Sequence, residues 1–578
     1  MLAVACTAWA ADPTKVLRVA SPDIETLDPQ QLNDIPSRDV VAAIFEGLYE
    51  RDYLASPAGL VPVTAAGLPT ISEDGKLWMI RLQPGIFFTD DPAFQGKPRE
   101  LVAEDYVYSL KRWLDPNLRR GGAPITTDLI IGARGAVDTA RQPGAKFDYD
   151  RPIEGLRATD RYTLEIRLRE ANYPVIEDFL IVRAAAREVV ESAGGDIRTR
   201  AVGTGPYRLK EWKRGSRIVL EANPRYRSLR FPPSSDPTHA ALVRSMQGKA
   251  LPQVGIVEIS FIEEDTTRLL EFERGRLDYV LLRGEIANRL LENGKLKPDY
   301  EASGVRRVVF PEPFLFSVYF NIEDPVIGGM SKERIGLRRA IALGFDKESL
   351  VKVVYADQAL SANQIVPPRL QGHDPTLRQK PSFDQPAANA MLDRVGYGNR
   401  DSEGFRKAPD GKALALTLTL RSGGIAREVQ SLWKKNMDAL GLRTSFRVTP
   451  FQDAIKELAA GEYQMYFGGY GGSASGYAEL LQLHGKQPPT ANASRFKSPE
   501  YDDAMERFLR STTEAERVVA ARKMSELAQM YLPLLPTVFR LENDYVQPWL
   551  LGFAPPVFST YWKYLDIDVA RRQQSGVR

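Results

Sequence analysis

The stretch Val202–Leu209 reads VGTGPYRL and is followed by EW at Glu211–Trp212 and by NPRY at Asn223–Tyr226. Two glycines and a proline in succession favour a tight turn, because glycine allows unusual backbone angles and proline fixes φ. We expect this turn to begin a β-hairpin. The Tyr207 side chain should project next to the glycines, where the backbone is bare. Taken alone, the stretch predicts a hairpin and nothing more.

Further along the chain, the hydrophobic pattern alternates between the periods of strands and helices. Leucines recur at every second position in 414–420, and Leu442, Thr444, Phe446 and Val448 alternate in the same way, as in strands with one buried face. Residues 463–467 read as a third strand. The helices that alternate with them are expected at 427–440 and 452–460. The order β-α-β-α-β predicts an open α/β sheet.

Two glycine-rich loops follow strands of this predicted sheet. Ser422–Gly424 follows the first strand, and residues 468–477, GGYGGSASGY, follow the third. Ligands of open α/β sheets bind outside the carboxyl ends of the strands, so we expect a ligand near these loops. Ordinary connections between strands and helices have the same composition, which leaves a purely structural interpretation open.

Length and composition are those of an ordinary globular protein of more than one domain. The 578 residues exceed what one hydrophobic core supports, which predicts two or three domains. The 77 basic and 74 acidic residues nearly cancel, so nucleic-acid binding is not expected. No stretch approaches the roughly 20 apolar residues of a membrane-spanning helix. Any action at a membrane is therefore expected to need a partner.

The first ten residues resemble a targeting segment. Leu2–Trp9 is apolar and Ala8–Ala10 fits a signal-peptidase site, so we expect export, cleavage near Ala10 and a periplasmic protein. A basic n-region is missing. The single cysteine, Cys6, lies inside this segment, and lipid attachment there is the alternative, although the leucine expected three positions upstream is absent.

Signatures of the common enzyme classes are missing, and we expect neither catalysis nor a cofactor. None of the Gly-Lys pairs is followed by Ser or Thr, which excludes a phosphate-binding loop of the GxxxxGK[ST] type. The three histidines, His239, His373 and His484, are too dispersed for a histidine metal motif, and we expect no bound metal. Ser473 does not fit the G-x-S-x-G pattern of serine hydrolases.

Several segments in succession resemble one protein family. The stretch quoted first closely resembles the "GTGPY…W…L…NPxYW" segment of extracellular solute-binding proteins of family 5, the peptide-binding receptors of ABC importers. Residues 103–112, AEDYVYSLKR, resemble the family's "AEDVVYSLKR" helix, and residues 273–278 its "xxGEID" turn. Residues 338–342 and 345–347 resemble its "RxAixxaiDr" helix. The matches keep the family's order along almost the whole chain.

The resemblance implies a bilobal α/β fold of the periplasmic-binding-protein type with a hinge. The first lobe is expected to comprise residues 11–58, 191–315 and 537–578, an inserted subdomain 59–190, and the second lobe 316–536. Ligand contacts from both lobes would stabilise a closed state, which a membrane permease coupled to ATPase subunits recognises. A monomer is expected.

The sequence departs from the peptide-binding pattern at one place. Family members that bind the free amino group of a peptide have "GWxxD" after the third strand of the second lobe, where the aspartate pairs with the ammonium group. Here residues 469–473 read GYGGS, so Tyr470 keeps the aromatic ring while Ser473 replaces the carboxylate. A hydroxyl supplies no countercharge. Peptides, modified peptides, sugars, opines and other small solutes all remain possible ligands, and an acid elsewhere, such as Glu46, could supply the charge instead.

The expected functional residues follow from the loops and from the resemblance. We expect the ligand to be bound by Glu46, Tyr108, Tyr207, Phe451, Tyr470 and Ser473. For Tyr108 the competing interpretation is an aromatic side chain at the edge of a core. The expected function is that of a transport receptor, and the alternative is a secreted enzyme or a chaperone-like peptide binder that is not coupled to transport.

Overall fold

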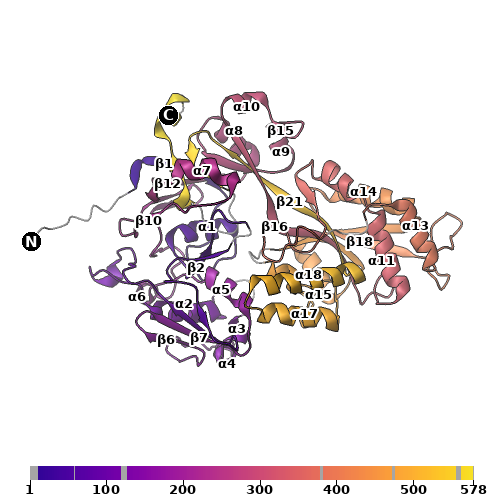
Figure 1. The fold of residues 1–578 in the computed structure, drawn as a ribbon, viewed down its shortest axis with the longest axis horizontal. Helices are drawn as coiled ribbons and strands as arrows, with labels where there is room; N and C mark the ends of the chain where they lie inside the picture. Colours follow the sequence, from indigo (N-terminus) through magenta and orange to yellow (C-terminus); the bar gives the residue numbers. More distant parts are fainter. Residues whose placement is uncertain are drawn as a thin grey trace, which may run out of the picture. The chain divides into compact units, whose positions relative to one another are not determined.

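The computed structural model describes residues 11–56, 59–118, 126–377, 382–471, 476–554 and 562–576. The chain divides into two compact units, which are taken in turn below (Figure 1). The first unit comprises Met1–Leu282, Arg289–Val308 and Asn543–Arg578, and the second comprises Arg283–Asn288 and Val309–Glu542. The proposed targeting segment, with Cys6, lies outside the described residues, as does Ser473.

The main sheet of the first unit has the order β1-β12-β9-β8. Its strands are β1 (Asp12–Ser21), β12 (Val254–Phe261), β9 (Arg217–Ala222) and β8 (Tyr207–Lys213). The hairpin expected after the GTGPY turn is confirmed, because β8 pairs antiparallel with β9. One hydrophobic core beneath this sheet includes Leu17, Ile44, Tyr207, Leu220, Val257 and Trp549.

Smaller elements complete this part of the first unit. The helices are α1 (Ile35–Ile44), α7 (Ala240–Met246), α8 (Asp265–Glu273), α10 (Pro298–Ala302) and α19 (Val569–Gln574). The short strand pairs are β2 (Tyr49–Arg51) with β3 (Leu60–Pro62), β10 (Leu229–Arg230) with β11 (Ala250–Leu251), β14 (Leu291–Glu292) with β15 (Lys295–Leu296), and β22 (Leu550–Leu551) with β23 (Asp566–Ile567).

A second antiparallel sheet in the first unit has a hydrophobic core of its own. Its order is β4-β5-β7-β6, with bounds Thr70–Ile71, Leu77–Arg81, Thr163–Arg167 and Leu156–Asp160. Helix α2 (Ala103–Leu114) contacts β6 and β7. The other helices are α3 (Thr126–Leu129), α4 (Ala133–Ala140), α5 (Ile176–Ile181) and α6 (Arg187–Ser192). Trp78, Tyr106, Leu110, Leu164 and Phe179 belong to this core.

The second unit contains the predicted β-α-β-α-β segment. It consists of β18 (Ala415–Arg421), α14 (Ala426–Ala439), β19 (Arg443–Thr449), α15 (Phe451–Ala460) and β20 (Met465–Gly471). Strand β18 pairs in parallel with both β19 and β20, so the open α/β arrangement expected from the sequence is confirmed. Leu416, Leu418 and Leu420 point into the core together with Trp433 of α14.

Two long strands extend this sheet beyond the predicted part. Strand β16 (Arg306–Phe320) pairs antiparallel with β20, and β21 (Leu534–Val546) lies on the other side of β16, which gives the order β13-β21-β16-β20-β18-β19. Strand β13 (Tyr279–Leu282) pairs with the end of β21, and β17 (Ala359–Ser361) pairs with its middle. Both β16 and β21 contain a boundary between the two units, at Val308 and at Glu542.

Helices of the second unit pack beside this sheet (Figure 1). They are α9 (Gly284–Asn288), α11 (Lys332–Gly344), α12 (Lys347–Ser349), α13 (Gln385–Arg394), α16 (Tyr477–Leu481), α17 (Pro499–Arg510) and α18 (Glu514–Tyr531), besides α14 and α15. The start of helix α18 is capped, because the Thr513 hydroxyl accepts a hydrogen bond from the Glu516 backbone amide.

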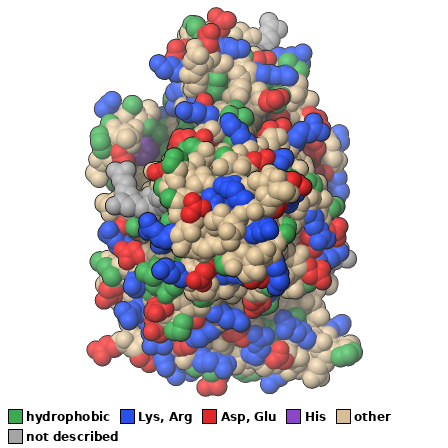
Figure 2. Space-filling model, turned by 90° about the vertical axis from the view of Figure 1, so that its right-hand side faces the viewer, with side chains coloured by type: hydrophobic (Ala, Val, Ile, Leu, Met, Phe, Trp, Pro, Cys, Tyr) green, Lys and Arg blue, Asp and Glu red, His purple; other side chains and the backbone are tan. Residues whose placement is uncertain are grey.

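The charged side chains on the surface have both signs. Basic and acidic side chains are interspersed on the face that Figure 2 shows. Among the described residues, none of the helices combines the length and the apolar composition that crossing a bilayer requires.

Candidate ligand-binding site

The carboxyl ends of three parallel strands meet at one edge of the second unit's sheet. Strands β18, β19 and β20 end at Arg421, Thr449 and Gly471. The Ser422 backbone amide donates a hydrogen bond to the Thr449 carbonyl at 2.8 Å, which joins two of the ends. Edges of this kind hold ligands in open α/β sheets. The edge is therefore the candidate site.

Glycines of β20 allow aromatic rings to lie directly on its backbone. A Cβ atom on Gly468 would overlap the Tyr466 ring, and one on Gly469 would overlap the Phe314 ring of the neighbouring strand β16. A side chain larger than hydrogen at either position would require the ring or the strand to move. The glycine-rich loop thus has a packing role in addition to any contact with a ligand.

Tyr470 lies at the end of β20, opposite Leu315 of β16, and is half-buried. Burial raises the pKa of its phenol, and the charge of Glu479 raises it further. Glu479 itself is buried, on the short helix α16. Tyr470 is therefore a neutral hydroxyl that can donate or accept a hydrogen bond. Its neighbour in the motif, Ser473, lies outside the described residues.

Phe451 is the first residue of α15 and is separated from the end of β19 by Pro450 alone. Its side chain is 47% exposed, which is unusual for so large an apolar residue. The Arg421 guanidinium lies 5.4 Å from the centre of the Phe451 ring, within the range of a cation–π interaction. An exposed ring beside an exposed cation can bind a ligand that carries an apolar group and a negative charge.

The first unit holds the other expected residues in its interior. Glu46 is 5% exposed. Its carboxylate accepts hydrogen bonds from the Thr204 hydroxyl at 3.1 Å, from the Tyr226 hydroxyl at 3.0 Å, and from both terminal nitrogens of Arg227 at 2.7 and 3.0 Å. Glu46 thus joins the GTGPY turn to the NPRYR segment. Arg227 balances the charge of Glu46.

Tyr207 and Tyr108 also lie in hydrophobic cores. Tyr207 has no exposed surface, and its hydroxyl donates to the Trp562 carbonyl at 3.3 Å. Tyr108 is 6% exposed, packs against Tyr149 and has the Arg187 guanidinium 5.6 Å from its ring centre. The placement of Tyr108 corresponds to the competing interpretation, an aromatic side chain at the edge of a core.

Of the six expected residues, the structure places Phe451 and Tyr470 at the same sheet edge. Sequence reasoning missed Arg421, although it is the first residue after the last alternating leucine of β18 and so had to lie at the carboxyl end. It also missed Phe314, because the pairing of β16 with β20 cannot be read from local patterns. Within the described residues, no group of three or more Asp, Glu, His or Cys side chains could hold a metal ion.

An ion-pair network lies beside the unit boundaries, on the second unit's side. The Arg540 guanidinium donates to the buried Glu312 carboxylate at 2.8 Å, and Arg283 donates to the same carboxylate at 3.1 Å. Arg283 also pairs with Glu542, whose pKa is raised by burial. The network connects residues next to three of the points at which the chain passes from one unit to the other.

The amino-acid sequence is similar to those of known proteins. The sequence profile of the bacterial extracellular solute-binding proteins, family 5 Middle, matches residues 59–490. Di/tripeptide-binding protein 2 of Pseudomonas aeruginosa is 24% identical, with 84% of each chain covered, and the periplasmic oligopeptide-binding protein OppA of Escherichia coli is 23% identical, with 96% of this chain and 93% of OppA covered.

A solved structure shows the same fold. The structure of HbpA2 from Haemophilus parasuis matches with a TM-score of 0.74 at 16% identity, covering 96% of this chain and all of that one. The fold expected from the sequence, α/β and of the bilobal periplasmic-binding-protein type, is thereby confirmed. With its motifs in the family order and most of its length matched by the family profile, the chain belongs to the bacterial extracellular solute-binding proteins of family 5.

Proposed function

We propose that this protein is the periplasmic receptor of an ABC importer and that it delivers a peptide or a peptide-like small solute to the membrane permease. The observation that carries the proposal is the family match over residues 59–490. The relatives named above are peptide-binding proteins, which favours a peptide-like ligand. We propose no catalytic step, because the sequence lacks the phosphate-loop, histidine-metal and serine-hydrolase motifs.

The two units are proposed to act as the two lobes. In this proposal the inserted subdomain, residues 59–190, corresponds to the part of the first unit built on β4-β5-β7-β6. Strands β16 and β21 each contain a unit boundary and are the proposed hinge. Ligand contacts from both lobes would stabilise the closed state, which the permease recognises.

The candidate site suggests which ligands the receptor prefers. Phe451 and Arg421 present an aromatic ring and an unshielded positive charge, which suit an apolar side chain and a carboxylate. Ser473 stands where relatives that bind free amino groups have an aspartate. We propose a ligand whose α-amino group is blocked or absent and whose acidic group lies near Arg421.

Calorimetry with matched free and N-acetylated peptides tests the ligand class. We expect N-acetylation to leave the affinity unchanged, and Ser473→Asp to strengthen binding of the free peptides about tenfold, because a partly buried charged hydrogen bond contributes roughly 1.5–3 kcal/mol. A strong preference of the unchanged protein for free amines would contradict this proposal. Mass spectrometry of the solute released from natively purified protein then identifies the ligand.

Lobe closure has a test of its own. A saturating ligand should reduce the radius of gyration in small-angle scattering, and an unchanged radius would argue against a hinge receptor.

Export is tested separately. We propose that the mature chain begins at Ala11, which N-terminal sequencing of the exported protein determines. Lipid attached to Cys6 would instead support the anchored alternative.

A further inference from the structure

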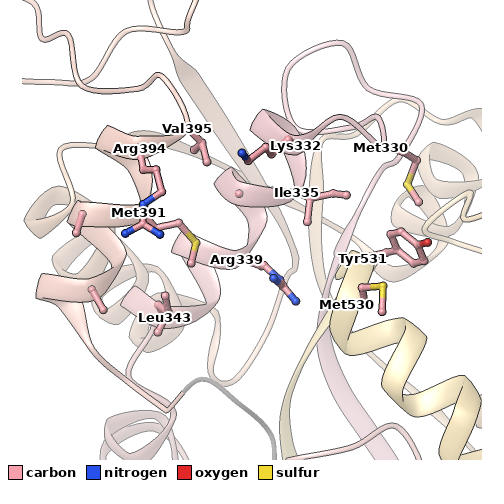
Figure 3. A pocket seen from close by; sticks show the side chains of 13 residues that line it. Met330, Lys332, Ile335, Arg339, Leu343, Met391, Arg394, Val395, Met530 and Tyr531 are labelled. Carbon is pink, nitrogen blue, oxygen red and sulfur yellow. The ribbon is translucent and has the colours of Figure 1, made fainter.

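The second unit contains a hollow that is separate from the edge of β18, β19 and β20. Helices α11 and α13 form two of its walls, and the C-terminal end of α18 closes the third side (Figure 3). Its volume is about 740 Å³. Sites for small organic ligands typically measure about 300–1,000 Å³, so the hollow has room for such a molecule.

The walls of the hollow are fixed by buried contacts. Arg338 of α11 is fully buried and donates to the backbone carbonyls of Tyr531 and Leu532 at 2.8 and 3.1 Å, which joins α11 to the end of α18. Gly336 of α11 lies so close to Val395, just after α13, that a Cβ atom there would overlap its methyl groups. The hollow is therefore preformed, and a ligand need not order it.

Much of the lining is apolar. The side chains that would contact a hydrocarbon chain are those of Met330, Ile335, Leu343, Met391, Val395 and Met530. Met330 and Met530 are both among the exposed large apolar residues of the protein. Methionine is flexible and polarizable, so methionine-rich surfaces adapt to apolar ligands of irregular shape.

The charged residues of the lining all have the same sign. Lys332, Arg339 and Arg394 line the hollow, and none of its described lining residues is Asp or Glu. In Figure 3 the Arg339 side chain extends into the space between α11 and the end of α18, where Met530 lies opposite. Neither the Arg339 nor the Arg394 guanidinium has a hydrogen bond or an ion pair with another residue in the described part of the chain.

We propose that this hollow binds a small amphiphilic anion, a single acyl chain that ends in a carboxylate. The chain lies against the methionines, and the carboxylate accepts charge-assisted hydrogen bonds from Arg339, while Arg394 and Lys332 add positive charge to the lining. Most of the lining is apolar, and its charged residues are all cationic. A molecule with both an apolar chain and a negatively charged group matches it. The inference does not depend on the proposed transport ligand, since the two sites share no residue.

Titration of the protein with 11-(dansylamino)undecanoate, monitored by dansyl fluorescence, tests the proposal. We expect saturable binding that is at least tenfold tighter than that of the methyl ester of the same probe, which has the chain without the charge. Arg339→Gln combined with Arg394→Gln should weaken binding of the acid about tenfold or more and leave the ester unaffected. Lys435→Gln, which removes an exposed charge from α14, is the matched control and should change neither affinity.

Protection of an introduced thiol locates the probe. In a Cys6→Ser background, Ala390→Cys places a thiol on the exposed wall of α13, and Lys435→Cys places one away from the hollow. The bound acid should slow maleimide modification at position 390 and not at position 435. Equal binding of acid and ester, unchanged affinity in the arginine variant, or no protection at position 390 would each overturn the proposal. If the same arginine variant instead lost only its interaction with the permease, the hollow would be a protein-docking groove.

Discussion

Arg227 donates hydrogen bonds from both of its terminal nitrogens to the buried carboxylate of Glu46, at 2.7 and 3.0 Å. The same guanidinium donates to the Val63 carbonyl at 2.9 Å, so one side chain connects three segments of the first unit. Bidentate pairs of this kind fix geometry as well as charge. The pair explains why the family-like GTGPY and NPRY segments occur together, since Glu46 contacts both of them.

Glu46→Gln should therefore act on stability. It leaves the Arg227 charge largely buried without a counterion, and we expect the free energy of unfolding to fall by about 3 kcal/mol. Glu211→Gln removes one partner of the exposed pair with Arg217 and should cost less than about 1 kcal/mol. Urea unfolding without ligand measures both. Unchanged stability together with lost ligand affinity would show that Glu46 binds ligand after all.

The overlap between Gly469 and the Phe314 ring predicts a difference between two glycine substitutions. Gly469→Ala should lower the free energy of unfolding by about 1–3 kcal/mol, because the ring or the strand must move. Gly424→Ala places a methyl group in open space and should be nearly neutral. Thermal unfolding of the two variants compares them. Similar stability would mean that the Phe314 ring moves freely.

Local patterns predicted the parts of the fold whose signals are local. The alternating leucines of β18 and the helical spacing around Trp433 placed the parallel segment of the second unit correctly. Strands β16 and β21 were missed because their partners lie far away in the sequence.

The candidate site was predictable to a similar extent. Phe451 and Tyr470 lie at the predicted sheet edge because topology brings the carboxyl ends of parallel strands together. Glu46 and Tyr207 were chosen by motif, and burial cannot be read from a motif. The partner that neutralises Glu46, Arg227, stands 181 positions away from it.

Lys347 makes the stability of the second unit depend on pH. Burial lowers its pKa to about 8, while its amine donates to the Ala362 carbonyl at 2.7 Å. Between about pH 8 and pH 10 the unfolded chain still binds the proton that the folded state has lost, so this residue's contribution makes stability rise with pH. Lys347→Met should remove that rise and stabilise the protein at pH 7.

The exposed Lys352→Met is the control for this prediction, and its pH profile should match that of the unchanged protein. Urea unfolding at intervals from pH 7 to pH 10 gives both profiles. A Lys347→Met profile parallel to that of the unchanged protein would mean that the lysine stays charged in the folded state.

Arg421 and Phe451 should divide ligand recognition between charge and apolar contact. Arg421→Gln should abolish a preference for N-acetylated peptides with a free carboxylate over the corresponding amides, a loss of about tenfold in affinity for the acids. Phe451→Ala should weaken the binding of acids and amides equally, because the ring contributes contact area and no charge.

Lys435→Gln and Ile455→Ala are the matched controls. The second removes a similarly exposed apolar side chain from the next turn of α15. Calorimetry measures the affinities, and because all four side chains are exposed, stability should change by no more than about 0.5 kcal/mol. If the control variants weakened binding as much as Arg421→Gln and Phe451→Ala, the ligand would not be bound at this edge of the sheet.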